Sequence, residues 1–272
     1  MSPDTDELHK PLAPWGIAMI DMFHNGLAEI LPFIAIGFAA QLVDGAIGMA
    51  FGAVATSLLI GVLDVSPAQA SYRVHIIKCF TSAASGVSHA LNGNIEKRLL
   101  VKLILPGVIG GAMGAYGLVW IDGDAIKPYV FAYLGLLGII LVLKGIRGNT
   151  KRRVPRTAEP LAFAGGLLDA VGGGGWGPVV SSGLMLQGAE PRKVIGSVNS
   201  AEFFVAIATS SAFISHFGLA HLAGPTLGLL IGGVAAAPFG ALVTRLLPAP
   251  VIMVLVGSIL TLTMLYWLFP SA

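Results

Sequence analysis

The sequence predicts an all-α integral membrane protein that is built from two inverted repeats. Hydrophobic residue types make up 55% of the 272 residues and charged types only 11%. A soluble globular protein carries about a quarter charged residues, so a water-exposed domain of this size is excluded. The net charge of +2 and the lack of a dense basic face argue against nucleic-acid binding. The single cysteine excludes a disulfide framework and a CxxC metal site.

Ten apolar segments divide the chain, and five of them are comfortably long enough to cross a bilayer, which takes about 20 residues. A sixth, at 128–143, is marginal. The other four are short and meet in pairs at glycine-rich joints, a geometry that membranes tolerate only where it is packed in protein or lines a cavity. The ten segments are 27–43, 46–62, 67–91, 99–120, 128–143, 161–171, 175–188, 192–217, 222–244 and 250–269.

The two halves of the chain repeat one pattern. The sequence DGAIGMAFG at 44–52 corresponds to DAVGGGGWG at 169–177, with an aspartate eight residues before a glycine in both. Pro67 and Pro191 then open the next helices. Repeats with paired broken helices are typical of secondary transporters, in which the site lies at the repeat interface.

Each repeat is predicted to hold a glycine-rich, re-entrant helix pair followed by three transmembrane helices. The predicted divisions are an N-terminal segment 1–26, a first repeat 27–146, a basic cytoplasmic linker 147–160 and a second repeat 161–269.

The basic residues predict the orientation of the chain. Loop 144–158 is placed in the cytoplasm, and loop 216–221 and both termini outside, which puts 12 of the 16 Lys and Arg residues inside. This count requires that 161–188 is a re-entrant hairpin or two full spans. One broken span would reverse the second half, and that alternative stays open.

A polar stripe marks one face of the predicted helix 67–91, with steps of three and four residues. Its members are His75, Lys78, Ser82, Ser85, His89 and Asn92. Helix 192–217 carries a thinner copy that includes Asn199 and Glu202. Lys78 and Glu202 each lie roughly 17 Å into their helices, where a charge costs at least about 2.5–3.5 kcal/mol and calls for a partner.

Three interpretations of Lys78 and Glu202 stay open. They form a structural ion pair that holds the halves in register, or Lys78 binds an anion while Glu202 modulates it or carries a proton, or the two never meet. His75 is either a hydrogen-bonded interior residue or a substrate ligand. Ser82 and Ser85 line the substrate or bond back to their own helix.

The glycine-rich joints predict a second kind of anion site. Helix N-termini expected at 46 and 175 would offer free N–H groups and a positive dipole end at membrane depth. We favour this role for Gly45, Gly48 and 172–175. Close helix packing is favoured for Gly111, Gly114, Gly232 and Gly233. Asp44 and Asp169 are expected to cap the following half-helices, with a proton-carrying role as the alternative. The candidate substrate-binding residues are Gly45, Ala46, Gly48, His75, Lys78, Ser82, Gly173, Gly174, Gly175, Trp176, Asn199 and Glu202.

The glycine-rich tips, the proline-started polar helices and the two-fold repeat resemble the sulfite exporter TauE/SafE family over most of residues 30–269. The resemblance implies movement of sulfite, organosulfonates such as sulfoacetate, or other small anions across the bacterial inner membrane. The sequence departs from the commoner glycine-rich pattern at 49–51 and in carrying Lys78, which leaves the substrate open.

We therefore expect a multi-pass secondary transporter, and in particular an exporter, of small sulfur-containing anions. The anion is bound at the repeat interface by half-helix N-termini and polar helix faces. An anion channel and an intramembrane enzyme that uses His75, Lys78 and His89 are the alternatives. The expected partners are a small sulfite-like or sulfonate anion and the lipid bilayer, with a homodimer left open. No cofactor, catalytic residue, metal or nucleic acid is expected, since the histidines lack compact metal-ligand spacing.

Overall fold

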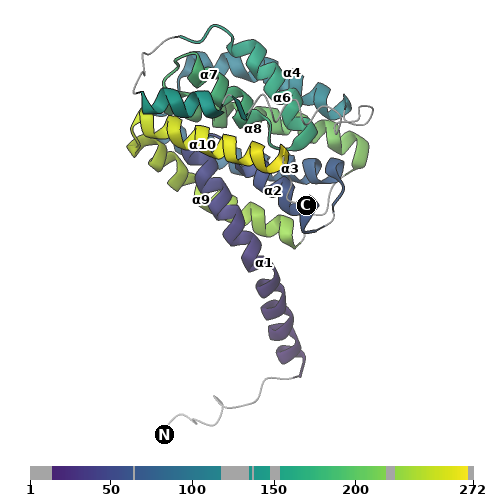
Figure 1. Ribbon diagram of the computed structural model, residues 1–272. Helices are drawn as coiled ribbons and strands as arrows, with labels where there is room; N and C mark the ends of the chain where they lie inside the picture. The colour runs from purple at the N-terminus through teal and green to yellow at the C-terminus, as the bar shows by residue number, and fades with distance from the viewer. Residues whose placement is uncertain are drawn as a thin grey trace.

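The computed structural model describes residues 14–63, 65–117, 135–136, 138–147, 154–218 and 224–268. Every regular element in these residues is a helix, as predicted (Figure 1). The first half contains α1 (Pro14–Ile47), α2 (Phe51–Gly61), α3 (Pro67–Leu91), α4 (Lys97–Gly117) and a further helical stretch within 138–147. The second half contains α6 (Ala158–Gly172), the π-helical turn η2 (Gly177–Ser181), α7 (Ser182–Leu186), α8 (Pro191–Phe217), α9 (Pro225–Leu246) and α10 (Ala249–Leu268).

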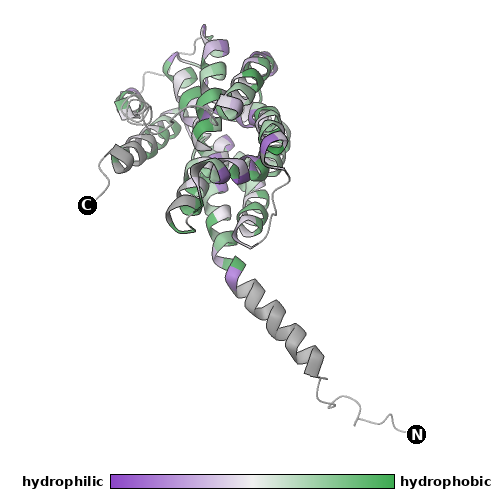
Figure 2. Cartoon of the chain, turned by 90° about the vertical axis from the view of Figure 1, so that its right-hand side faces the viewer, coloured by the Kyte–Doolittle hydropathy of each residue, from purple (hydrophilic) through white to green (hydrophobic). Residues whose placement is uncertain are grey.

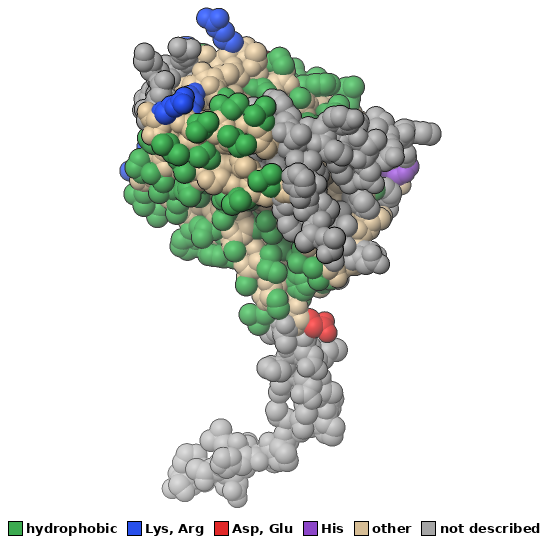
Figure 3. Space-filling model, viewed as in Figure 1, with side chains coloured by type: hydrophobic (Ala, Val, Ile, Leu, Met, Phe, Trp, Pro, Cys, Tyr) green, Lys and Arg blue, Asp and Glu red, His purple; other side chains and the backbone are tan. Residues whose placement is uncertain are grey.

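The outer surface is apolar, as a lipid-facing surface must be. Four helical segments in the described residues are long and apolar enough to cross a membrane, namely Glu29–Ile47, Lys97–Gly117, Pro191–His216 and Pro225–Leu246. Hydrophobic side chains cover much of the visible face, and the visible Lys and Arg side chains gather towards its upper end (Figure 3). The hydrophobic colour also dominates the helices in a second view, although hydrophilic stretches occur inside the bundle (Figure 2). An apolar surface of this extent indicates a membrane environment.

Most helix bounds match the predicted segments, but those around the first joint were wrong. The first apolar segment was expected to begin at 27 and the next helix at 46, whereas α1 begins at Pro14 and continues through Ile47. The chain breaks at Gly48 (φ 80°) and Ala50 (φ 135°), and α2 begins only at Phe51. Glycine and alanine at 45–46 fit either a joint or a helix, so the sequence does not locate the break. Residues 148–153 of the predicted basic linker 147–160 lie outside the described residues, as do residues 219–221 of the predicted external loop.

The second broken pair folds back on itself as a helix hairpin. The backbone N–H groups of Arg156 and Thr157 donate to Gln187 Oε1 at 2.9 and 3.2 Å, so the start of α6 lies beside the end of α7. The break at 173–175 lies between these two arms. A single broken span would hold the start of α6 and the end of α7 on opposite sides of the bilayer. Because these two ends are in contact, the alternative of one broken span is wrong.

The first broken pair folds back in the same manner. Phe33 of α1 packs against the same hydrophobic cluster as Leu58 of α2 and Leu63 just beyond it. The end of α2 therefore lies alongside α1 rather than continuing its direction.

The breaks of the two pairs pack directly against each other. A Cβ on Gly52 would overlap the carbonyl oxygen of Gly173, and a Cβ on Gly177 would overlap that of Gly48. Gly173, like Gly48, has a positive φ, of 69°. Gly48 and Gly173 are equivalent positions in the two repeats, as are Gly52 and Gly177, and each pair is 125 residues apart in the sequence. The two halves therefore meet through matched contacts, and only glycine permits the approach at Gly52 and Gly177.

The helix ends form two opposite ends of the bundle. At one, Arg192 donates to Asn94 Oδ1 at 2.7 Å, Lys193 to the Gly93 carbonyl at 2.8 Å, and Lys144 to the Leu186 carbonyl at 2.8 Å. We call this the basic end, and the α6–α7 hairpin opens there.

At the opposite end, Tyr72 near the start of α3 donates to the carbonyl of Gly218, just past α8. Because α2 leads into α3 there, the α1–α2 pair opens at this opposite end. These contacts place the start of the predicted cytoplasmic loop 144–158 at the basic end. The inverted arrangement in a membrane stays a prediction.

Cysteine labelling in intact spheroplasts tests the orientation. In a Cys79→Ala background, Lys97→Cys at the basic end is expected to react with an impermeant maleimide only after permeabilisation, since the positive-inside rule places it in the cytoplasm. Ser215→Cys at the opposite end, also exposed, is expected to react at once. Reaction of both cysteines from one side would contradict the orientation.

A pair of alanine substitutions tests the packing of the breaks. Gly52→Ala is expected to reduce the yield of folded protein sharply, because its Cβ has no room beside Gly173. Gly172→Ala is the matched control, since a Cβ there meets no atom within 4 Å, and alanine suits a helix better than glycine. Fluorescence-detected size-exclusion chromatography measures both yields, and equal losses would refute the contact.

Candidate functional site

A buried cluster of charges lies beside the breaks. Lys78 of α3 is at its centre, with Nζ 3.0 and 2.9 Å from the two carboxylate oxygens of Asp169 and 2.7 Å from Oε1 of Glu202. These three side chains are 4%, 1% and 7% exposed. Lys78 and Glu202 are therefore in contact, and of the three interpretations left open by the sequence, the one in which they never meet is wrong. Lys78 thereby ties α3 of the first half to α6 and α8 of the second.

Two further members of the stripe on α3 complete the contacts of the carboxylates. His75 Nε2 lies 3.2 Å from Asp169 Oδ2, and its Nδ1 lies 2.8 Å from the carbonyl oxygen of Ser71. Both partners are acceptors, so a ring that carries both N–H protons satisfies both contacts. Ser82 Oγ donates to Glu202 Oε2 at 3.1 Å. The structure thus brings His75, Lys78 and Ser82 together, as the helical spacing predicts.

The two aspartates close the breaks, as expected of caps. Asp44 Oδ1 accepts the backbone N–H of Phe51 at 3.2 Å, and Asp169 Oδ1 accepts that of Trp176 at 3.1 Å. Each carboxylate therefore reaches from the last turn of one helix to the first N–H of the next. The sequence predicted the caps, but it did not reveal that Asp169 also binds Lys78, because that contact joins different helices.

Most of the candidate glycines at the joints serve close packing. Gly45 lies against α9, where a Cβ added at this position would lie 3.0 Å from the Cα of Gly240. A Cβ on Gly174 would lie 2.7 Å from the backbone N of Ala53, and one on Gly175 would lie 2.7 Å from the backbone N of Asp169. Ala46 belongs to the last turn of α1 and not to a helix N-terminus.

The remaining candidates lie in two different surroundings. Trp176 is completely buried, and its indole N–H donates to the carbonyl of Val198 at 3.0 Å, so its ring fills the core. Asn199 Nδ2 lies 3.5 Å from the carbonyl oxygen of Asp44 and 3.2 Å from His89 Nε2. His89 is therefore placed with asparagines, away from the carboxylate that His75 and Lys78 share.

A polar chain leads from the basic end to this region. Asn94 Oδ1 accepts from Arg192, and its Nδ2 donates to the carbonyl of Ala241 at 2.9 Å, which fixes the orientation of the amide. The same Nδ2 lies 3.0 Å from His89 Nδ1, so Nδ1 accepts this hydrogen bond. Sequence inspection missed Asn94, because it follows the helix end and lies off the stripe.

Three buried hydroxyl groups have no hydrogen-bond partner within the described part of the chain. They belong to Thr56, Ser85 and Thr209. Buried hydroxyls are ordinarily bonded. Ser85 and Thr209 are separated by the same 124 residues as Lys78 and Glu202. Unpaired hydroxyl groups are therefore present on α3 and α8, two of the three helices that form the charged cluster.

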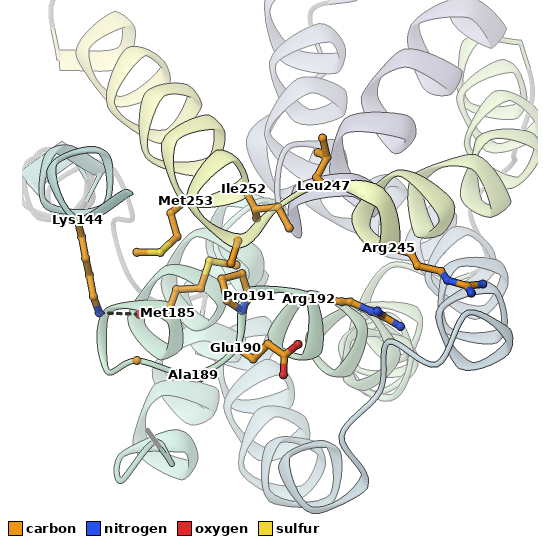
Figure 4. Close-up of a pocket in the computed structure, with 12 residues that line it drawn as sticks. Lys144, Met185, Ala189, Glu190, Pro191, Arg192, Arg245, Leu247, Ile252 and Met253 are labelled. Atoms are coloured by element: carbon orange, nitrogen blue, oxygen red, sulfur yellow. Dashed lines mark hydrogen bonds between the residues drawn. The ribbon is translucent and has the colours of Figure 1, made fainter. Parts of the chain in front are cut away.

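A separate pocket of about 270 Å³ opens at the basic end (Figure 4). Its lining includes Lys144, Glu190, Arg192 and Arg245 together with apolar residues of α10, and no member of the charged cluster. Lys144 Nζ donates to the carbonyl of Met185 at 3.2 Å. In the described residues, no group of three or more His, Cys, Asp or Glu side chains could hold a metal ion.

Removal of Lys78 is expected to destabilise the protein strongly. Lys78→Met leaves Asp169 and Glu202 buried without their common cation, a loss of about 3–5 kcal/mol. The triple variant Lys78→Met, Asp169→Asn and Glu202→Gln removes both unpaired charges and is expected to recover much of the lost stability.

Thermal denaturation of the purified protein measures the effect of each variant. Lys102→Met is the matched control, since Lys102 forms an exposed ion pair with Glu159 at 3.1 Å and exposed pairs contribute little. A fall in melting temperature that is as large for Lys102→Met would contradict the role of burial.

Comparison with known proteins agrees with the architecture. The family described as "Sulfite exporter TauE/SafE" matches residues 33–267. The "Probable membrane transporter protein YtnM" of Bacillus subtilis (strain 168) is 37% identical over 245 residues, which cover 87% of this chain and 81% of that protein. No solved structure matches the chain. The chain is a multi-pass bacterial membrane protein and belongs to the TauE/SafE sulfite exporter family.

Proposed function

We propose that this protein is a secondary transporter that exports small sulfur-containing anions, such as sulfite or a two-carbon sulfonate. The observation that carries the proposal is the buried Lys78 cluster at the place where two helix hairpins from opposite ends of the bundle meet. Membership of a family described as sulfite exporters supports the class of substrate. A site at the interface of two repeats, beside broken helices, is the arrangement that alternating access uses.

The cluster suggests how binding of an anion is linked to movement. The ammonium group of Lys78 contacts carboxylates on two helices, α6 and α8. An incoming sulfonate or sulfite would compete with one of these carboxylates for the ammonium. Because α6 belongs to a hairpin and α8 does not, loss of one contact changes the forces between the hairpin and the rest of the bundle. Exchange of partners at Lys78 therefore couples the occupancy of the site to the position of the hairpins.

Counterflow in proteoliposomes tests this function. Vesicles that contain the purified protein and unlabelled sulfoacetate or sulfite are expected to accumulate the labelled anion transiently from outside. Flux without this acceleration by the anion on the far side would indicate a channel instead. Flux of neither anion, from protein shown to be folded, would contradict the proposed substrate class.

The double variant Lys78→Met with Glu202→Gln separates an anion ligand from a structural pair. Loss of a charge-assisted hydrogen bond of about 1.5–3 kcal/mol weakens anion binding about ten- to a hundredfold, so the half-saturating concentration of sulfoacetate should rise by that factor. Lys102→Met is the control and is expected to transport normally. Wild-type affinity in the double variant would refute the role of Lys78 as a ligand.

A further inference from the structure

Each hairpin carries a hydroxyl side chain that lies against the break of the other hairpin. Thr56 of α2 and Ser181 of η2 are 125 residues apart, as are the break glycines Gly48 and Gly173. A Cβ added at Gly173 would lie 2.5 Å from Thr56 Oγ1, and one added at Gly48 would lie 2.8 Å from Ser181 Oγ. The two hydroxyl groups therefore occupy equivalent places in the two halves.

These two hydroxyl groups differ in their hydrogen bonds. Ser181 Oγ donates to the carbonyl of Gly48 at 3.2 Å. Thr56 is only 9% exposed, yet its hydroxyl group has no hydrogen-bond partner in the ranges that the structure describes. Leaving a buried hydroxyl group unbonded costs free energy, and the serine shows that this position can be bonded within the chain. The hydroxyl group of Thr56 is therefore available to a ligand.

The unpartnered hydroxyl group lies at the same break as the buried lysine. Lys78 Nζ is 3.5 Å from the carbonyl oxygen of Gly173, the glycine against which Thr56 lies. Val74 Cγ1, one turn before Lys78 on α3, would lie 3.4 Å from the Cβ added at Gly173. In the other half, Glu202 stands at the position that corresponds to Lys78. A cation and an unpartnered hydroxyl group on one side thus correspond to a carboxylate and a bonded serine on the other.

We propose that Thr56 is a second ligand of the transported anion and donates a hydrogen bond to one of its oxygens while Lys78 binds another. This inference rests on the proposed function and extends its site to the α1–α2 pair. A sulfite or sulfonate group carries three oxygens on one sulfur atom, so it can accept from both side chains at once. Because Asp169 of α6 competes with the anion for Lys78, binding would tie the first hairpin to α3 while it loosens the second.

The hydroxyl group also gives the site a preference among anions. The ammonium group of a lysine is a point charge with rotatable donors, and it accepts anions of many shapes. A hydroxyl group fixed on α2 adds a second donor at a set distance from that charge. Thr56 therefore favours an anion that has several oxygens over a monatomic anion such as chloride.

Thr56→Val tests this role, because valine has nearly the shape of threonine and lacks only the hydroxyl group. Removal of a buried, unpartnered hydroxyl group should leave the melting temperature of the purified protein unchanged or raise it. The Kd for sulfoacetate, measured by isothermal titration calorimetry, should rise about ten- to a hundredfold, since the lost hydrogen bond is made to a charged group. Thr56→Ser keeps the hydroxyl group and should bind sulfoacetate nearly as tightly as the wild type.

Ser181→Ala is the matched control at the equivalent position. It removes the hydroxyl group that donates to the carbonyl of Gly48, so its melting temperature should fall, because a buried acceptor loses its donor. Its Kd for sulfoacetate should stay close to that of the wild type. Stability and affinity are thus expected to change in opposite ways at the two positions.

Wild-type affinity in Thr56→Val, or a lower melting temperature in that variant, would overturn the ligand role of Thr56. An equal loss of affinity in Ser181→Ala would overturn it as well. In each of these cases the wild-type protein still binds sulfoacetate, and the proposed function is left intact. A folded wild-type protein that binds neither sulfoacetate nor sulfite would instead count against the proposed function, and this inference would fall with it.

Discussion

Asp169 joins the break of the second hairpin to the buried charges, and the rest of the site depends on this junction. Its Oδ1 accepts the N–H of Trp176 and a contact from Lys78, while its Oδ2 accepts from His75 and again from Lys78. A carboxylate away from water is tolerated only when its acceptor positions are filled. The tip of the hairpin therefore cannot move without disturbing the charges, and the charges cannot rearrange without releasing the tip.

The helix N-termini at the breaks are not free to bind an anion in the way that the sequence had suggested. An anion bound by backbone N–H groups alone needs those groups free, yet Asp44 and Asp169 already accept the N–H groups of Phe51 and Trp176. The positive ends of both helices are thus compensated by built-in carboxylates. An anion would bind the backbone N–H groups of a hairpin tip best after the aspartate at that tip has moved away. An anion that competes for Lys78 would displace Asp169 in this way. Under the proposed function, the backbone N–H groups and Lys78 would then act as one anion site.

Much of this architecture could be predicted from the sequence, because it depends on spacing along single helices. Steps of three and four residues placed His75, Lys78 and Ser82 on one face, and the repeat placed Lys78 and Glu202 at the same depth in their helices. The bond from Lys78 to Asp169 could not be predicted, because it depends on how helices far apart in the chain cross. The glycines at 45–52 were ambiguous for the same reason: a missing Cβ equally suits an anion or another backbone.

The difference between the halves explains why a buried ion pair need not lock such a protein. An isolated lysine–carboxylate pair must lose its full interaction before either partner moves, and the unpaired charge that remains costs several kcal/mol, of order 3–5. Lys78 is instead held by two carboxylates on two helices, so it keeps one partner while it releases the other. A second lysine at position 202 would balance the charges and satisfy both aspartates, but it would also tie both hairpins firmly. Glutamate at that position leaves one hairpin capped by an aspartate without its own cation, which makes the cluster responsive to added charge.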